Sequence, residues 1–260
     1  YPLIDNMGNL VNRKWGGKIE PYSKDLEKKT SGKIPVKNFI EDYIVPQATE
    51  FIDKYDPDIL WYDGEWDTNV KDLKSYEISA YFYNNAEGRK EVAVNDRYGL
   101  VTDCPYYEAL GGASKSGRNW LRFKSGDYFT SEFHDHGIKE HKRPWEECRS
   151  ISQSFGFNWQ DTDKSVISSE EFIEMFIDIV SNGGNLLLIV NLDAQGALPE
   201  VQAKRLKDIG EWLMINGEGI YGTRTHSTIS EGEIRYTRSK DYQKIYAIST
   251  RWPGKQLKLK

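Results

Sequence analysis

The sequence predicts an α/β fold built on a parallel β-sheet. Short apolar strands alternate with helical segments along the chain, and four strand-then-helix units follow one another. Such connections bring consecutive strands together as parallel neighbours through right-handed crossovers. Four units are half of a (β/α)8 barrel, so the chain is either a complete open sheet or the C-terminal half of a barrel. The lack of an initial Met and the unpatterned opening favour the half barrel.

The first half of the chain contains two of these units. Residues 1–35 are rich in Gly, Lys and Asn and are expected to form a long loop. A helix is expected from Lys37 to Tyr55, where Pro46 either kinks the helix or starts a second one. Strand 59–63 is followed by a helix over about 72–86 and by a strand at 92–94. Residues 98–143 are expected to be an insertion, and loops of that length are usually functional.

The second half contains the other two units. A third strand is expected near Cys148–Ser152. Ser168 and Glu171 form a capping box that opens a helix from Ser169 to Val180. A short apolar strand follows at Asn185–Val190, of the kind found in buried parallel sheets. Pro199 then opens a helix that runs to about Asn216.

The pattern changes after Tyr221. Residues 233–238 and 244–250 alternate as strands do and are joined by a polar turn. The chain is therefore divided into residues 1–221, which belong to the β/α part, and residues 222–260, which start a separate β module.

Composition excludes several classes of protein. The chain has 260 residues, 38% of them hydrophobic and 29% charged, with a mean hydropathy of -0.68, as in ordinary globular proteins. No apolar run approaches the roughly 20 residues of a membrane span. The net charge of -5 argues against a nucleic-acid partner. Aromatic residues make up 13% of the chain, a content that is common in carbohydrate-active proteins.

Cysteines and sequons bear on the compartment. Cys104 and Cys148 do not form a CxxC pair, so they indicate neither a zinc site nor a disulfide framework. The chain has no Asn-x-Ser/Thr sequon, which disfavours a heavily glycosylated lysosomal protein. A secreted or periplasmic bacterial enzyme fits this absence.

The segment from Pro57 to Trp66 carries the strongest functional signal. It is predicted as a buried strand that ends at Asp63 and is followed at once by Gly64. Parallel barrels present catalytic acids at this end of their strands. Trp61, Tyr62 and Trp66 supply flat apolar faces, and a carboxylate among such rings indicates glycoside chemistry. An Asp that caps the following turn explains the segment equally well.

Several further motifs accompany this strand. In chain order the set is Tyr55-x-Pro57-Asp58-x-x-Trp61-x-Asp63-Gly64, Val94-Asn95-Asp96-Arg97-Tyr98-Gly99, Trp145-Glu146-x-Cys148, Val180-Ser181-x-Gly183-Gly184-Asn185-x-Leu187-Leu188 and Gly210-x-Trp212-x-x-x-Asn216-Gly217-Glu218-x-Ile220-Tyr221. Together they resemble the second half of α-L-fucosidases of glycoside hydrolase family 29, from about residue 37 to the end. The resemblance implies an incomplete or distorted (β/α)8 barrel followed by a β-sandwich, which residues 222–260 would begin.

The resemblance also implies a retaining hydrolysis of terminal α-L-fucose. One carboxylate attacks the anomeric carbon, and a second carboxyl protonates the leaving oxygen and later activates water. Asp63 matches the family's nucleophile. The segment Asp127–Glu132 resembles the one that carries the acid/base, which selects Glu132, with Glu146 and Asp135 as rivals. The expected partner is a fucosylated oligosaccharide or glycoconjugate, and a complete sugar pocket needs the N-terminal half of the barrel.

Other positions carry over less specifically. Trp61 and Trp145 resemble apolar walls around the sugar, although core packing explains them as well. Arg97 is a candidate donor to a sugar hydroxyl or to the nucleophile, with a structural ion pair to Asp96 as the alternative. Glu65 is a candidate for tuning the nucleophile. His134, His136 and His141 are expected to be loop residues, and no metal or cofactor is expected.

Two departures from the family pattern keep other functions open. The family's Asn-Ile-Gly-Pro is replaced here by Ile189-Val190-Asn191-Leu192, and the sugar-binding histidines of the barrel's first half lie outside this chain. The alternatives are a noncatalytic glycan-binding relative and a barrel glycosidase of other specificity, such as an α-galactosidase. Whether the protein is a homo-oligomer also stays open.

Overall fold

The computed structural model describes residues 37–63, 70–99, 126–132, 144–257 and 259, with three short strands before residue 22. The chain forms two compact units, Tyr1–Glu50 and Phe51–Lys260. The first unit contains β1 (Leu3–Ile4), β2 (Leu10–Asn12) and β3 (Glu20–Pro21), which pair antiparallel. The prediction of one loop over residues 1–35 is wrong at these strands, because two or three residues are too few to produce a periodic signal.

The helix expected over residues 37–55 is present in two parts. A π-helical stretch, Ile40–Ile44, leads directly into α2 (Val45–Tyr55). Pro46 is the second residue of α2 and comes directly after the π-helical stretch. The backbone stays helical at Val45, whose N–H donates to the Ile40 carbonyl oxygen, so the two parts are continuous and Pro46 does not open a separate helix. The change from π-helical to α-helical hydrogen bonding falls beside Pro46, which has no backbone N–H to donate.

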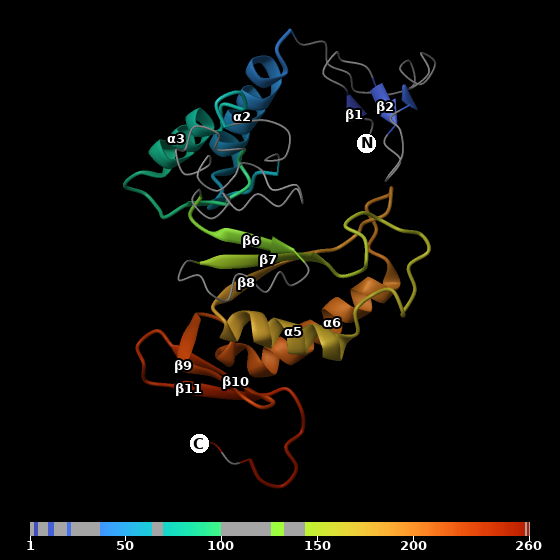
Figure 1. Cartoon of the computed structure of the whole chain (residues 1–260), viewed down its shortest axis with the longest axis vertical. Coiled ribbons are helices and arrows are strands. Elements are labelled where there is room, and N and C mark those ends of the chain that lie inside the picture. The colour runs from blue at the N-terminus through green and yellow to red at the C-terminus, as the bar shows by residue number, and fades with distance from the viewer. Residues whose placement is uncertain are drawn as a thin grey trace, which may run out of the picture. The chain divides into compact units, whose positions relative to one another are not determined.

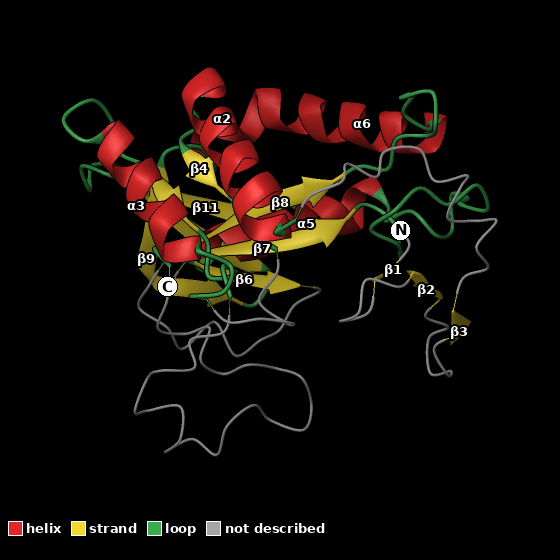
Figure 2. Cartoon of the chain, turned by 90° about the horizontal axis from the view of Figure 1, so that it is seen from above, coloured by secondary structure: helices red, strands yellow, loops and turns green. Residues whose placement is uncertain are grey.

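In its described residues, the second unit contains five parallel strands that follow one another in chain order. β4 (Ile59–Leu60) pairs with β5 (Ala93–Val94), and β6 (Phe129–Glu132) pairs with β7 (Trp145–Ser150). β8 (Gly184–Ile189) pairs on the other side of β7, and a single parallel bridge between Asn95 and Tyr128 connects β5 to β6. Figure 2 shows β6, β7 and β8 side by side and running in the same direction.

Two predictions about this sheet need correction. Strand β6 lies inside the span 98–143, which was predicted as a loop insertion, because three of its four residues, Thr130, Ser131 and Glu132, are polar and give no alternation with apolar residues. Strand β7 begins at Trp145, earlier than the predicted start at Cys148. Charged residues at positions 146 and 147 conceal its beginning in the sequence. Both errors lie in strands with several polar residues.

Helices cover one face of the sheet. These helices are α5 (Ser169–Ser181) and α6 (Glu200–Asn216), and the predicted capping box of α5 is present: the Ser168 hydroxyl accepts from the backbone N–H of Glu171. The core that they form with the strands contains Phe129, Trp145, Phe172, Met175, Ile179 and Ile209. A further helix, α3 (Ser75–Ala86), connects β4 to β5. None of the helices in the described residues combines the length and apolarity of a membrane span.

A second sheet packs on the other side of α5. It is antiparallel and consists of β9 (Thr223–Glu231), β10 (Ile234–Ser239) and β11 (Ile245–Ser249), with β10 in the middle. In Figure 1, α5 lies between this sheet and β6–β8. An ion pair of 2.9 Å from Arg235 Nε to Asp178 Oδ1 ties β10 to α5. The two strands expected near 233–238 and 244–250 are present, and the described sheet has one strand, β9, more than the sequence indicated.

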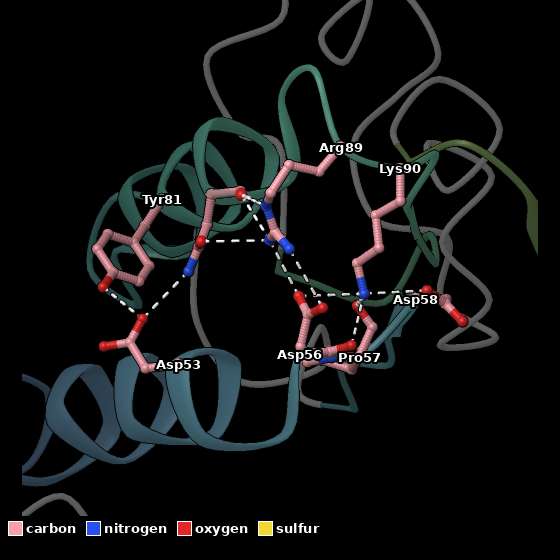
Figure 3. Close-up of polar contacts among 8 residues, drawn as sticks. Asp53, Asp56, Pro57, Asp58, Tyr81, Arg89 and Lys90 are labelled. Carbon is pink, nitrogen blue, oxygen red and sulfur yellow. Dashed lines mark hydrogen bonds and ion pairs between the residues drawn. The ribbon is translucent and has the colours of Figure 1, made fainter.

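The turn that leads into β4 is held by two basic residues (Figure 3). Arg89, just after α3, makes two hydrogen bonds to the Asp56 carboxylate, at 3.0 and 3.3 Å. Lys90 donates to the carbonyl oxygens of Asp56 and Pro57 and to the Asp58 carboxylate. Asp56 adopts a positive φ of 45°, which is uncommon for a residue with a side chain. The contacts of Arg89 and Lys90 stabilise this turn, which directly precedes β4.

The contact between β8 and Trp145 leads to a prediction about stability. A Cβ atom at Gly184 would lie 2.5 Å from the Trp145 ring, whereas one at Gly210, in α6, would meet no atom within 4 Å. We expect Gly184→Ala to lower the free energy of unfolding by about 1–3 kcal/mol through overpacking. Gly210→Ala, the control, should raise it by up to about 1 kcal/mol because Ala favours helix. Urea unfolding followed by Trp fluorescence measures both, and equal effects would contradict the proposed packing.

Candidate active site

The carboxyl ends of β4, β5 and β6 meet at one edge of the sheet. Asp63 lies three residues after β4, Arg97 follows β5, and Glu132 is the last residue of β6. The prediction of a buried strand over 59–63 that ends at Asp63 is thus wrong in its length, since β4 ends at Leu60, and Ile59 is 50% exposed. The buried Asn95 side chain joins the first two ends: its amide accepts from the Tyr62 N–H and donates to the Tyr62 carbonyl, both at 2.8 Å. These two hydrogen bonds connect the residues just after β4 to the residue just after β5. It therefore fixes the backbone immediately before Asp63.

Arg97 connects the two predicted carboxylates. Its Nη1 atom lies 3.3 Å from Asp63 Oδ1 and 2.5 Å from Glu132 Oε1. The Arg97 side chain is only 2% exposed, whereas those of Asp63 and Glu132 are 52% and 38% exposed. Because both oxygens contact one nitrogen atom, their separation cannot exceed the sum of these two distances, a range that includes the roughly 5 Å separation of a retaining glycosidase. A buried cation thus holds two accessible carboxylates beside each other.

The Arg97 guanidinium also contacts Trp61 and Thr130. Its guanidinium carbon lies 5.0 Å from the centroid of the Trp61 ring, within cation–π range. Its Nε–H donates to Thr130 Oγ1 at 2.7 Å. Among the described residues the buried Nη2 atom has no hydrogen-bond partner. Trp61 and Thr130 thus hold two sides of the guanidinium.

Glu146 lies on the same side of the sheet as Glu132. Thr130 pairs with Glu146 and Glu132 with Cys148, and in parallel strands paired side chains point to the same face. The indole N–H of Trp61 donates to Glu146 Oε1 at 2.8 Å. Burial raises the pKa of Glu146, opposed by the Trp61 hydrogen bond and the Arg97 charge. Glu146 is thus a carboxyl group that favours its protonated form more than a free Glu does.

Trp145 does not join this group. As the neighbour of Glu146 in an extended strand it points to the opposite face, where α5 and α6 pack. It is 8% exposed, and its indole N–H donates to the carbonyl oxygen of Asn182 at 3.2 Å. Of the two interpretations that the sequence left open for Trp145, core packing is the one that the structure supports. Trp61, by contrast, lies at the site as predicted.

Cys148 lies at the base of the group. It is buried, on the face shared by Glu132 and Glu146. Burial raises the pKa of its thiol to about 11, and the charges of Glu132, Glu146 and Asp63 act in the same direction, opposed by Arg97. A thiol with so high a pKa is a poor nucleophile at neutral pH. Cys148 therefore acts here as a small apolar packing residue.

Some sequence-based candidates cannot be placed. Glu65, Asp135 and the three histidines His134, His136 and His141 lie outside the described residues. Within the parts of the chain that the structure describes, no three His, Cys, Asp or Glu side chains gather as a metal site would require.

The structure adds Thr130, which the sequence did not single out, and it gives a different contact to Asp96, which the sequence named as an ion-pair partner of Arg97. Both residues are buried, and Asp96 accepts from the hydroxyl and the backbone N–H of Thr130. The signal for Thr130 was its place in a β-branched and aromatic run, Tyr128–Ser131, which is typical of a strand. Because the segment was interpreted as a loop, the contact between β6 and the end of β5 was not predicted.

Two carboxyl groups and a tryptophan at the carboxyl edge of a parallel β/α sheet are the arrangement of a glycoside-hydrolysing site. Comparison with known proteins makes the assignment specific. The family model described as alpha-L-fucosidase matches residues 15–218. The chain belongs to the α-L-fucosidase family.

Curated and solved relatives agree with this assignment. The chain is 30% identical to the tissue α-L-fucosidase of Rattus norvegicus, over 88% of this chain and 45% of the relative. It is 31% identical to the α-L-fucosidase of Dictyostelium discoideum, over 78% of this chain and 39% of the relative. The Thermotoga maritima α-fucosidase in complex with a mechanism-based inhibitor superposes with a TM-score of 0.59 at 31% identity, covering 79% of this chain and 42% of that one. The chain thus spans about half the length of the relatives it matches.

Proposed function

We propose that the whole protein hydrolyses terminal α-L-fucose from fucosylated glycans with retention of configuration, through a covalent glycosyl-enzyme on Asp63. The observation that carries this proposal is the contact of Asp63 and Glu132 with one nitrogen of Arg97, in a chain of the fucosidase family. A retaining enzyme needs two carboxyl groups at this spacing. The five consecutive parallel strands support the further proposal that this chain forms one half of a (β/α)8-like barrel, with β9–β11 starting a β-sandwich.

Asp63 is assigned the role of nucleophile. It is the more exposed of the two carboxylates that contact Arg97, and it directly follows Tyr62, whose backbone is hydrogen-bonded to the Asn95 side chain. A nucleophile must be reachable from solvent and still be held in one direction.

Two carboxyl groups are candidates for the acid/base. Glu132 has the favourable position, since it shares Arg97 with Asp63. Glu146 has the favourable electrostatics, since burial raises its pKa and a general acid must carry a proton at the start of the reaction. We assign the role to Glu132 on geometry, with Glu146 as the alternative.

The test is hydrolysis of an aryl α-L-fucoside by the whole protein, with the first-formed sugar followed by ¹H NMR. Retention predicts that α-L-fucose appears before mutarotation. Initial formation of β-L-fucose would overturn the covalent mechanism. Binding of fucose without turnover would identify a noncatalytic relative, and turnover of an aryl α-D-galactoside alone would identify another specificity.

A further inference from the structure

Arg97 is held from behind by two buried residues, Thr130 and Asp96. Arg97 Nε–H donates to Thr130 Oγ1 at 2.7 Å. The same hydroxyl is 2.7 Å from Asp96 Oδ1, and the backbone N–H of Thr130 donates to that oxygen at 3.1 Å. Thr130 is 5% exposed and Asp96 2% exposed. The three side chains therefore form a continuous chain of hydrogen bonds that ends at the two carboxylates of the site.

The direction of each bond in this chain follows from the number of protons. A guanidinium can only donate, so Thr130 must accept from Arg97. Its hydroxyl has a single proton, which it donates to Asp96. The Asp96 carboxylate thus orients the hydroxyl so that a lone pair faces Nε. Because the guanidinium is planar, holding Nε also fixes the direction in which Nη1 points.

We propose that Thr130 and Asp96 are positioning residues that lock the guanidinium of Arg97, so that Nη1 stays on Asp63 and Glu132 while the sugar is processed. The inference rests on the proposed function of the same site. Without the Thr130 hydroxyl, Arg97 loses its Nε partner, and the plane of its guanidinium can rotate about the side chain. The carboxylates then lose their common partner.

The positioning of Arg97 by Thr130 and Asp96 is expected to depend on pH. Burial raises the pKa of Asp96 to about 6, opposed by the hydrogen bonds from Thr130 and the charge of Arg97. Above that pH the carboxylate accepts strongly, and as the pH falls below it the neutral acid becomes a weaker acceptor for the hydroxyl. The charged or titratable groups that interact with Asp96 or Arg97 are Asp63, Tyr128, Glu132, Glu146 and Cys148.

The first arm of the test compares variants of the whole protein with an aryl α-L-fucoside. Thr130→Val keeps the shape but removes the hydroxyl, and we expect kcat to fall by about 10–100-fold, with a smaller change in KM. Thr130→Ser restores the hydroxyl and should return kcat to near the wild-type value. Thr237→Val is the matched control, since Thr237 is also buried and donates one 2.7 Å hydrogen bond, to the carbonyl oxygen of Gly219 in the C-terminal part.

The second arm is a pH profile. Asp96→Asn keeps an acceptor oxygen for Thr130 but cannot ionise. We expect the wild-type protein to lose activity as the pH falls through about 6, in step with protonation of Asp96. Asp96→Asn should lose this inflection while keeping measurable activity. An unchanged inflection in Asp96→Asn would assign it to another group and overturn the role of Asp96.

The third arm does not depend on turnover. Crystal structures of Thr130→Val and Thr130→Ser should show the Arg97 guanidinium turned away from Asp63 in the first and in place in the second. If Thr130→Val leaves Arg97 in place, or leaves kcat at the level of Thr237→Val, the lock is overturned. A wild-type protein that does not cleave fucosides would refute the proposed function, and the position of Arg97 would still decide about the lock.

Discussion

Asp63→Ala is expected to lower kcat of the whole protein toward an aryl α-L-fucoside by about four orders of magnitude or more, because the covalent intermediate can no longer form. The side chain is half exposed, and among the described residues its side-chain contact is with Arg97, at 3.3 Å. Removing it should therefore change stability little. Steady-state kinetics, with thermal unfolding measured on the same sample, separates loss of chemistry from loss of fold.

A small anion gives a second readout for the same variant. The space left by the carboxylate admits azide, which attacks the same face of the sugar, so rescue should produce β-fucosyl azide. Asp58→Ala is the matched control: Asp58 lies before the other end of β4, is 79% exposed, and contacts Lys90. It should retain nearly full activity. Normal turnover by Asp63→Ala would refute the assigned nucleophile.

The second large effect concerns the choice between Glu132 and Glu146. We expect Glu132→Gln to lower kcat on a fucosylated glycan by about 10²–10⁴-fold, the usual contribution of a general acid. On an aryl fucoside whose leaving group departs without a proton, cleavage of the glycosidic bond should be much less affected. Comparing the two substrates therefore measures protonation of the leaving oxygen.

The same pair of substrates decides the alternative. Glu146→Gln removes the ionisable carboxyl group but keeps an amide oxygen that can accept the hydrogen bond from the Trp61 indole. If Glu132 is the acid/base, Glu146→Gln should affect both substrates to a similar extent, and azide should yield α-fucosyl azide only with the Glu132 variant. The opposite pattern would transfer the role to Glu146.

Local patterns were sufficient for most of the elements. The capping box at Ser168 and Pro199, directly before α6, mark helix starts through local backbone chemistry, so they can be recognised without knowing what packs nearby. Strand β8 is apolar enough to be recognised as a buried parallel strand. Strand β6 was missed because its polar residues face the site, where function and not burial sets the composition.

The sequence by itself determined the family, the parallel β/α order and Asp63 as the leading candidate at a strand end. Only the tertiary structure decided which groups surround it, since Arg97 lies 34 positions from Asp63, and Glu146 lies 85 positions from Trp61. It also placed Trp145 in the core and Glu146 at the site, although the two are adjacent in sequence. The physical reason is strand register: neighbouring residues in a strand point to opposite faces, and pairing between strands determines which distant side chains share a face.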